Sequence, residues 1–374
     1  MAAILVIGAG RVGRAIALDL VQHHRVTVAD IHTERLSALH AEAPSLTVAH
    51  IPSQDPQTLQ RLAQQHDLLI TAVPGHAGFS LLTHLIEAGK PIVDISFFPE
   101  DPFSLQEKAQ QYGAAVIVDA GIAPGLCNLL LGRCLSEMEV ESYECWVGGL
   151  PLERRWPWQY KAPFSPTDVI EEYTRPVRQR IAGQLVTKPP LSEIEYRHFP
   201  GIGTLEAFNT DGLRTLLTTT TVPTLIEKTL RYPGHAEYVR VLAESGFFSE
   251  EPLQVEGLTL HPRAITEALL TRAWHLSPDE PDCVLLWVRI QGKKDGKPTE
   301  KTFYLYDQAD LKRRMSAMAR TTGYTCTAIA ALLLDGVSLP PGIYAPELLG
   351  QNPTAAAFVL EYLAERGITV RENP

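Results

Sequence analysis

A glycine-rich turn directly after the first apolar segment constrains the fold of this chain more than any other feature. Residues 3–7 are apolar, a turn spans Gly8 to Gly13, and a helical pattern follows. In such a strand–turn–helix unit, Gly8 permits the tight turn, Gly10 lets the backbone approach a pyrophosphate, and Gly13 lets the helix pack against the strand. Amide groups at the start of that helix stabilise an anion. We therefore predict a dinucleotide site formed by Gly8, Ala9, Gly10, Arg11, Val12 and Gly13.

An acidic residue marks the end of the second predicted strand. The strand pattern at residues 25–29 leads directly to Asp30. A carboxylate at this position of a dinucleotide-binding unit binds the ribose 2′-hydroxyl, and it repels a 2′-phosphate. Asp30 therefore predicts NAD rather than NADP as the cofactor, although the nearby Arg35 weakens that preference. A glycine-rich turn without a ligand is the alternative that the sequence leaves open.

Composition narrows the class of protein further. The chain has 374 residues, enough for two domains, and a net charge of −10, which argues against a surface for nucleic acid or an anionic membrane. Its five cysteines are scattered without a C-x-x-C pair, so we expect a reducing compartment and no zinc or other metal site. No signal-peptide pattern and no run of about 18 apolar residues is visible. These features predict a cytoplasmic protein.

The first third of the chain alternates short apolar segments with helical patterns. Such β-α-β repeats form a parallel sheet with helices on both faces. The predicted strands are residues 3–7, 25–29, 46–50, 67–72, 91–95 and 115–118. Loops after the carboxyl ends of these strands contact ligands in this kind of sheet. We therefore expect Pro74, Gly75, Ser96 and Gly121 to line the cofactor.

After about residue 125 the hydrophobic pattern changes to longer segments in which apolar and polar residues alternate. Hairpin signals lie at Ala182-Gly183 and Asp295-Gly296. Helical patterns at residues 167–173, 237–244 and 263–274 interrupt these segments. The predicted fold class is α/β, with an N-terminal Rossmann doubly wound parallel sheet and a second α+β domain with a mixed or antiparallel sheet. The predicted domains are 1–125 for NAD binding, 126–316 for substrate binding and dimerisation, and 317–374 as helices that return to the Rossmann domain.

Several longer blocks carry a resemblance to a known family. They span residues 93–97, 119–126, 147–151, 171–176, 206–214 and 229–235. In these blocks the chain resembles the saccharopine dehydrogenase superfamily, and within it the lysine 6-dehydrogenases. Relatives of saccharopine reductase carry an Asp-Pro-Gly-Ile-Asp-His stretch where this chain has residues 119–125, and Ala123 replaces the later acid. That difference favours lysine over saccharopine as the substrate.

The resemblance implies NAD-dependent oxidative deamination of the ε-amine of L-lysine by a homo-oligomer. The products are ammonia, NADH and allysine, which cyclises to 1-piperideine-6-carboxylate. This chemistry requires a general base with a pKa near the working pH, a cation for the α-carboxylate and an acid for the α-ammonium group. A saccharopine reductase and a non-catalytic NAD-binding sensor are the alternatives.

The candidate site residues come mainly from the family blocks, and each also has a structural interpretation. A histidine can cap a helix, an aspartate before glycine can shape a turn, and charges on a helix usually face solvent. A lysine acts as a base only when burial depresses its pKa. The predicted catalytic residues are Asp211, His235 and Lys161, and the predicted substrate-binding residues are Arg231, Tyr160, Glu172 and Phe97.

Overall fold

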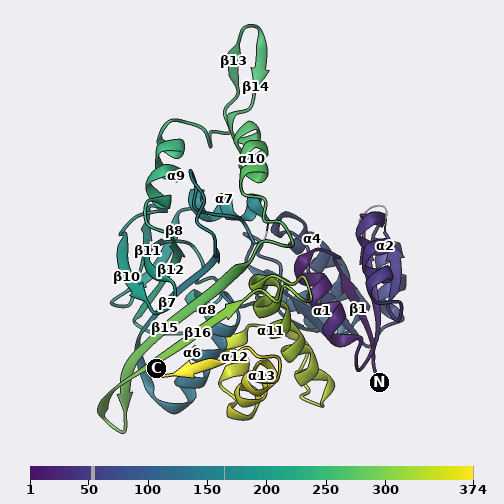
Figure 1. The fold of residues 1–374 in the computed structure, drawn as a ribbon. Coiled ribbons are helices and arrows are strands. Elements are labelled where there is room, and N and C mark those ends of the chain that lie inside the picture. Colours follow the sequence, from purple (N-terminus) through teal and green to yellow (C-terminus); the bar gives the residue numbers. More distant parts are fainter. Residues whose placement is uncertain (52–54, 164, 374) are drawn as a thin grey trace. The chain divides into compact units, whose positions relative to one another are not determined.

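The computed structural model describes residues 1–51, 55–163 and 165–373. The chain forms two compact units (Figure 1). Unit 1 contains Met1–Glu137 and Ala319–Thr369, and unit 2 contains Met138–Met318 and Val370–Pro374. The first boundary thus follows residue 137 instead of the predicted residue 125. The last strand of the chain belongs to unit 2, whereas the whole segment 317–374 was expected in the Rossmann domain.

Unit 1 contains a seven-stranded, fully parallel sheet with the order β17-β6-β5-β4-β1-β2-β3. Its strands are β1 (Ala3–Ile7), β2 (Arg25–Asp30), β3 (Thr47–His50), β4 (Leu68–Thr71), β5 (Ile92–Asp94), β6 (Ala115–Ile117) and β17 (Gly342–Tyr344). The six predicted strands are confirmed, and β17 is added from the C-terminal segment. The chain order reverses between β1 and β4, which places the crossover of the doubly wound sheet beside the glycine turn.

Helices cover this sheet. They are α1 (Arg11–Leu20), α2 (Thr33–Glu42), α3 (Pro56–Gln64), α4 (Gly75–Leu85), α5 (Gln106–Tyr112), α6 (Leu126–Glu137), α11 (Ala317–Leu334), α12 (Pro346–Gly350) and α13 (Pro353–Glu365). A core of buried aliphatic side chains joins α3, α4 and α5 to strands β1, β4, β5 and β6. The helices predicted within residues 317–374 are present, the two longest being α11 and α13.

A buried carboxylate ties these C-terminal helices to α1. Asp19 on α1 accepts hydrogen bonds from Tyr362 and Thr327, both at 2.7 Å, and pairs with Arg366 at 2.7 Å. The Arg366 guanidinium carbon also lies 3.3 Å from the centre of the Tyr362 ring. Because these contacts join α1 to α11 and to the end of α13, these two helices are an integral part of unit 1.

Unit 2 contains a mixed sheet with the main order β10-β11-β12-β7-β15-β16-β18. Its strands are β7 (Glu139–Pro151), β8 (Val177–Ile181), β9 (Gln184–Lys188), β10 (Glu195–Phe199), β11 (Gly203–Asn209), β12 (Thr224–Arg231), β15 (Asp282–Lys294), β16 (Lys297–Gln308) and β18 (Val370–Glu372). Strands β7 and β12 pair in parallel, and the other neighbours are antiparallel. The predicted fold class is therefore confirmed for both sheets.

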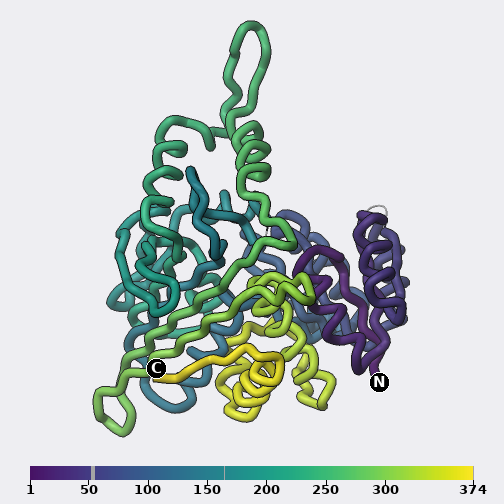
Figure 2. The backbone as a smooth tube through the Cα atoms, in the orientation of Figure 1, coloured from purple at the N-terminus to yellow at the C-terminus, as the bar shows by residue number. Residues whose placement is uncertain are grey.

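Both predicted hairpins are present in unit 2. Strands β8 and β9 meet at Ala182-Gly183, and β15 and β16 meet at Asp295-Gly296. All four turn residues have a positive φ, between 49° and 83°, as a two-residue turn that matches the twist of a hairpin requires. Figure 2 shows β15 and β16 as two long adjacent runs in green. A small separate hairpin, β13 (Leu253–Val255) and β14 (Leu258–Leu260), precedes α10.

Strand alternation decides which side chains of unit 2 meet its helices, α7 (Pro166–Thr174), α8 (Leu216–Thr219), α9 (His235–Glu244) and α10 (Pro262–Ala273). Leu205 and Leu230 point to one face of the sheet, into an apolar cluster built from strands. Successive residues of a strand point to opposite faces. Phe208 and Arg231 therefore face the other side, where Phe208 packs with α7, α9 and α10.

The described residues include no helix that is both long enough and apolar enough to cross a membrane.

Candidate active site

The glycine turn of unit 1 has the geometry that its sequence predicts. Gly8 has a φ of +110°, and a Cβ atom there would lie 2.2 Å from the carbonyl oxygen of Ala72. A Cβ atom at Gly13 would lie 1.9 Å from the carbonyl oxygen of Gly8. At Gly10, in contrast, an added Cβ would meet no protein atom within 4 Å. Packing within the protein therefore requires glycine at two of the three positions, and the third keeps the space before α1 open for a ligand.

The start of α1 fits an anionic group. Gly10 caps the helix without a side-chain hydrogen bond, and no acidic residue lies in the first turn. The amide groups of this turn thus keep their partial positive charge for a phosphate. The carboxylate of Asp30 accepts the amide of Ala9 at 2.5 Å and that of His32 at 2.7 Å. Asp30 therefore fastens the turn to β2, and each of its carboxylate oxygens can accept a further hydrogen bond.

The other predicted cofactor residues lie at the same edge of the unit 1 sheet. Pro74 and Gly75 begin α4 directly after β4. Ser96 follows β5, is buried, and packs so closely on α4 that a Cβ atom at Gly78 would lie 2.5 Å from its own. Gly121 lies in the loop after β6, where its carbonyl accepts the amide of Leu126 at 2.9 Å. Since the carboxyl ends of parallel strands meet at one edge, these loops and the glycine turn together fit an extended dinucleotide.

A buried cation forms the centre of a polar cluster in unit 2. Arg231 ends β12 and is 3% exposed. Its Nε donates to the hydroxyl of Tyr173 at 2.9 Å, and its Nη2 lies 3.4 Å from the hydroxyl of Tyr160 and 3.5 Å from a carboxylate oxygen of Glu172. The guanidinium carbon is 4.5 Å from the centre of the Tyr160 ring. The structure thus brings together three predicted substrate-binding residues. We call these three, together with Tyr173 and His235, the Arg231 cluster.

His235 joins the Arg231 cluster through Tyr173. Its Nε2 lies 3.0 Å from the Tyr173 hydroxyl, and its Nδ1 lies 3.2 Å from the carbonyl oxygen of Trp158. Burial, reinforced by the charge of Arg231, lowers the pKa of His235 to about 3, so its ring is neutral. A carbonyl only accepts, so Nδ1 carries the proton and Nε2 accepts from Tyr173. The hydrogen bonds therefore run in one direction, from Arg231 through Tyr173 to His235 and on to Trp158.

Glu172 has the ionisation behaviour of a group that titrates near neutrality. Burial raises the pKa of its carboxyl to about 7, although the neighbouring Arg231 has the opposite effect. Its side chain is 20% exposed. Burial also raises the pKa values of Tyr160 and Tyr173, so both hydroxyls keep their protons. The Arg231 cluster therefore contains one permanent cation and one carboxyl whose charge depends on pH.

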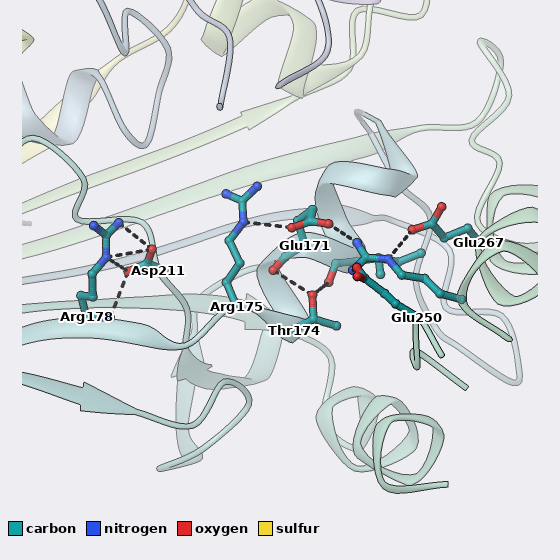
Figure 3. Close-up of polar contacts among 9 residues, drawn as sticks. Glu171, Thr174, Arg175, Arg178, Asp211, Glu250 and Glu267 are labelled. Carbon is teal, nitrogen blue, oxygen red and sulfur yellow. Dashed lines mark hydrogen bonds and ion pairs between the residues drawn. The ribbon is translucent and has the colours of Figure 1, made fainter. Parts of the chain in front are cut away.

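The preceding residue of α7 behaves differently from Glu172. Glu171 pairs with Arg175 at 3.0 Å and also with Arg263, which in turn contacts Glu250 and Glu267 (Figure 3). This is the network of exposed or half-buried ion pairs that is usual on a helix surface. Consecutive residues point about 100° apart on a helix, and of these two glutamates it is Glu172 that pairs with Arg231.

Three predicted site residues lie in other surroundings. Asp211 accepts hydrogen bonds from the backbone amide, Nε and Nη2 of Arg178 at 2.7–3.2 Å (Figure 3). The Nζ of Lys161 donates to the carbonyl oxygen of Ala273 at 3.2 Å. Phe97 belongs to unit 1, in the loop after β5. The described contacts of Asp211 are thus those of a residue that holds β8 to the end of β11.

Sequence reasoning missed two members of the site. Tyr173 shares the buried side of α7 with Val169 and Ile170, and a tyrosine in an apolar stripe needs a partner for its hydroxyl, which is the signal that could have found it. Glu206, 1% exposed, accepts the amides of Gly234 at 2.8 Å and Ala236 at 2.7 Å. It thus holds the start of α9, and no local pattern in the sequence announces this contact.

Two family models match almost the whole chain. Residues 4–117 match the family described as saccharopine dehydrogenase NADP binding domain, and residues 121–368 match the saccharopine dehydrogenase C-terminal domain. The chain is 22% identical to the saccharopine dehydrogenase [NADP(+), L-glutamate-forming] of Schizosaccharomyces pombe, over 100% of this chain and 99% of that protein. It is also 22% identical to the carboxynorspermidine synthase of Vibrio cholerae, over 94% and 93% of the two chains.

A solved structure shows the same fold. The apo saccharopine dehydrogenase (L-Glu forming) of Saccharomyces cerevisiae aligns with a TM-score of 0.81 at 19% identity, and the alignment covers 100% of this chain and 99% of that one. The two family matches together extend over nearly the whole sequence, and they indicate a nicotinamide dinucleotide as the class of cofactor. This chain therefore belongs to the saccharopine dehydrogenase family of NAD(P)-dependent oxidoreductases.

Proposed function

We propose that this enzyme catalyses the NAD-dependent oxidative deamination of the ε-amine of L-lysine. The observation that carries the proposal is the ion pair between the buried Arg231 and the half-buried Glu172, whose polar atoms are 3.5 Å apart. An α-amino acid presents the complementary pair, a carboxylate and an ammonium group on one carbon atom. The Arg231 cluster thus suits the head of an amino acid, and the reacting amine would lie at the far end of the substrate.

Each charged group of the Arg231 cluster has a defined part in this proposal. Arg231 binds the α-carboxylate, because a guanidinium offers a planar fork of donors that matches a carboxylate. Glu172 in its ionised form binds the α-ammonium group. Tyr160 supports the guanidinium with its ring face, at 4.5 Å. The two charges are close neighbours, as the carboxylate and ammonium groups of one α-carbon are.

His235 holds the cluster in position in this proposal. Its neutral ring accepts the Tyr173 proton, and the Tyr173 oxygen then faces the Nε of Arg231 as an acceptor. This chain of hydrogen bonds fixes the plane of the guanidinium before substrate binds. Lys161 and Asp211 stay predicted catalytic residues, and Lys161→Met and Asp211→Asn variants test them in the assay described below.

The choice of NAD rests on Asp30. Its carboxylate is held at the end of β2 by the amides of Ala9 and His32, so its negative charge stays where a 2′-phosphate would have to bind. The cofactor, when bound, accepts a hydride from the carbon atom that carries the amine. The residues that would hold it are the glycine turn and Asp30, together with the loops that contain Pro74, Gly75, Ser96 and Gly121.

The reaction balances as follows. The ε-carbon of lysine loses a hydride and its ammonium group loses one proton, which leaves an iminium cation. Water adds to the iminium carbon, the C–N bond breaks, and an aldehyde and an ammonium ion are released. The aldehyde then condenses with the α-amine of the same molecule and closes the ring of 1-piperideine-6-carboxylate, with loss of water.

A second candidate is the saccharopine dehydrogenase reaction. The similarity to the saccharopine dehydrogenase of Schizosaccharomyces pombe over the whole chain favours it. Ala123 argues against the saccharopine dehydrogenase reaction, because this residue replaces an acid of the saccharopine reductases that the chain resembles. Saccharopine also carries three carboxylates, and the Arg231 cluster supplies one cation.

The test is the formation of NADH, followed by absorbance at mildly alkaline pH with purified protein, NAD and L-lysine. Ornithine and saccharopine are run in parallel, and NADP replaces NAD in a second series. NADH formation with ammonia release from lysine supports the proposal, and turnover of saccharopine alone supports the second candidate. Arg231→Met should abolish turnover, whereas Arg289→Met, which removes an arginine paired with Glu144 on the unit 2 sheet, should not. If no substrate yields reduced cofactor, both proposed reactions are contradicted.

A further inference from the structure

Two buried acidic side chains lie at the carboxyl edge of the unit 1 sheet, at the ends of neighbouring strands. Asp94 ends β5 and is 0% exposed, and Asp119 lies in the loop after β6 and is 2% exposed. The amide of Ala120 donates to the backbone oxygen of Asp94 at 2.9 Å, which holds that loop against the end of β5. On β4, the hydroxyl of Thr71 donates to the Asp94 carboxyl. Three adjacent strand ends thus enclose the Asp94 side chain.

Burial and a few neighbouring groups determine the pKa of the Asp94 carboxyl. Burial, with a smaller contribution from the Asp119 carboxyl, raises the pKa of Asp94 to about 7, although the hydroxyl of Thr71 and the neighbouring Ser96 act in the opposite direction. From α11, the thiol of Cys326 also faces Asp94, and its own pKa is raised by burial and by that carboxyl. Within the described part of the chain, none of the groups that shift the pKa of Asp94 is positively charged.

The position of Asp94 in the sheet relates it to the cofactor. A dinucleotide lies across the crossover of a doubly wound sheet, which is here between β1 and β4. Asp30 at the end of β2 marks the side for one ribose. The second nucleoside therefore extends to the side of β4 and β5, where Asp94 lies beneath the loop that contains Ser96. The nicotinamide ring is positively charged when oxidised and neutral when reduced.

We propose that Asp94 couples proton binding to the oxidation state of the bound dinucleotide. Its ionised carboxylate favours the oxidised form, because its negative charge then compensates the charge on the ring through buried, low-dielectric protein. Its protonated form removes that attraction and favours the reduced cofactor by comparison. Asp94 is fully buried, so it acts through the electric field and not by contact. The inference depends on the cofactor class only, and it holds whether lysine or another amine is the substrate.

The sign of the pH dependence follows from linkage. Raising the pH through neutrality removes the proton from Asp94, so binding of NAD⁺ should tighten relative to binding of NADH. Conversely, reduction of the bound cofactor should raise the affinity of Asp94 for a proton. A coupling of this kind should change the ratio of the two dissociation constants by about three- to tenfold between pH 5.5 and pH 8.5.

The experiment measures cofactor binding in the absence of substrate. The dissociation constant of NADH is obtained from its fluorescence, and that of NAD⁺ from competition against NADH, at half-unit steps between pH 5.5 and pH 8.5. In the wild type, the ratio of the NAD⁺ constant to the NADH constant should fall as the pH rises. In Asp94→Asn, which keeps the shape of the side chain but does not titrate, the ratio should not change with pH.

A second variant protects the test against a folding defect in the first. Thr71→Val removes a hydrogen bond that lowers the pKa of Asp94 and leaves the carboxyl in place. The midpoint of the pH dependence should therefore move to higher pH in this variant. Three results would overturn the inference. The first is a ratio of the two dissociation constants that is independent of pH in the wild type, and the second is the same midpoint of the pH dependence in the wild type and in Thr71→Val. The third is a ratio that depends on pH in Asp94→Asn as it does in the wild type.

Discussion

Replacing Glu172 by glutamine tests whether the Arg231 cluster recognises the head of an amino acid. The substitution keeps the size of the side chain and removes its charge. A hydrogen bond to a charged group contributes about 1.5–3 kcal/mol, which corresponds to a loss of roughly 10- to 150-fold in kcat/KM, at about 1.4 kcal/mol for each factor of ten. We expect this loss mainly in KM, because the hydride leaves a carbon atom at the other end of lysine.

The pH profile gives the same prediction a second readout. Burial raises the pKa of Glu172 to about 7, so the carboxyl is mostly protonated below that pH and ionised above it. With this pKa, roughly one tenth of the enzyme carries the charge at pH 6 and about nine tenths at pH 8. The profile of kcat/KM reports the free enzyme. It should therefore rise through a limb near pH 7 in the wild type, and this limb should be absent in Glu172→Gln.

The assay compares two substrates that differ in one group. L-Lysine has the α-amine, and 6-aminohexanoate lacks it but keeps the carboxylate and the reacting amine. Glu172→Gln should weaken turnover of lysine and leave that of 6-aminohexanoate nearly unchanged. Glu171→Gln is the matched control, because Glu171 lies on the same helix and pairs with Arg175 and Arg263 instead of Arg231. Equal losses with both substrates, or a limb near pH 7 that persists in Glu172→Gln, would refute the assignment.

Three further predictions concern the cofactor site and the stability of each unit. Gly10→Ala should weaken NADH binding about tenfold or more without changing the unfolding temperature. Gly13→Ala should lower both the affinity for NADH and the unfolding temperature, because its Cβ would lie 1.9 Å from a carbonyl oxygen of the turn. Asp19→Ala leaves Arg366 without its buried partner and should cost about 3 kcal/mol of stability in urea unfolding. Glu206→Gln loses one of two amide contacts at the start of α9 and should cost about 1–2 kcal/mol by the same measurement.

Each of these predictions has an outcome that would contradict it. Normal NADH affinity in Gly10→Ala would mean that no ligand approaches the backbone there. Equal stabilities of Asp19→Ala and the wild type would show that solvent replaces the ion pair at α1. For Glu206, the contradicting result is a variant with wild-type stability, which would mean that its contacts with the amides of Gly234 and Ala236 do not stabilise the start of α9.

Most elements of this fold could be predicted from local patterns. Strands β1 to β6 are short apolar runs, and the two hairpins of unit 2 carry turn residues that accept a positive φ. The glycine turn and Asp30 could be predicted as a dinucleotide site because their functions depend on backbone geometry within one strand–turn–helix unit and the next strand. Strand β17 could not, because its three residues acquire their strand character only by pairing with β6.

The Arg231 cluster shows what only the tertiary structure decided. The sequence by itself predicted five separate candidates for the site and did not distinguish between them: Arg231, Tyr160, Glu172, His235 and Asp211. Contacts between residues far apart in the chain separated them: Arg231 bonds to Tyr173, 58 positions away, whereas Asp211 bonds to Arg178, 33 positions away. Hydrogen bonding and burial depend on which surfaces meet after folding. The charges and pKa values of such residues therefore depend on packing that no local pattern encodes.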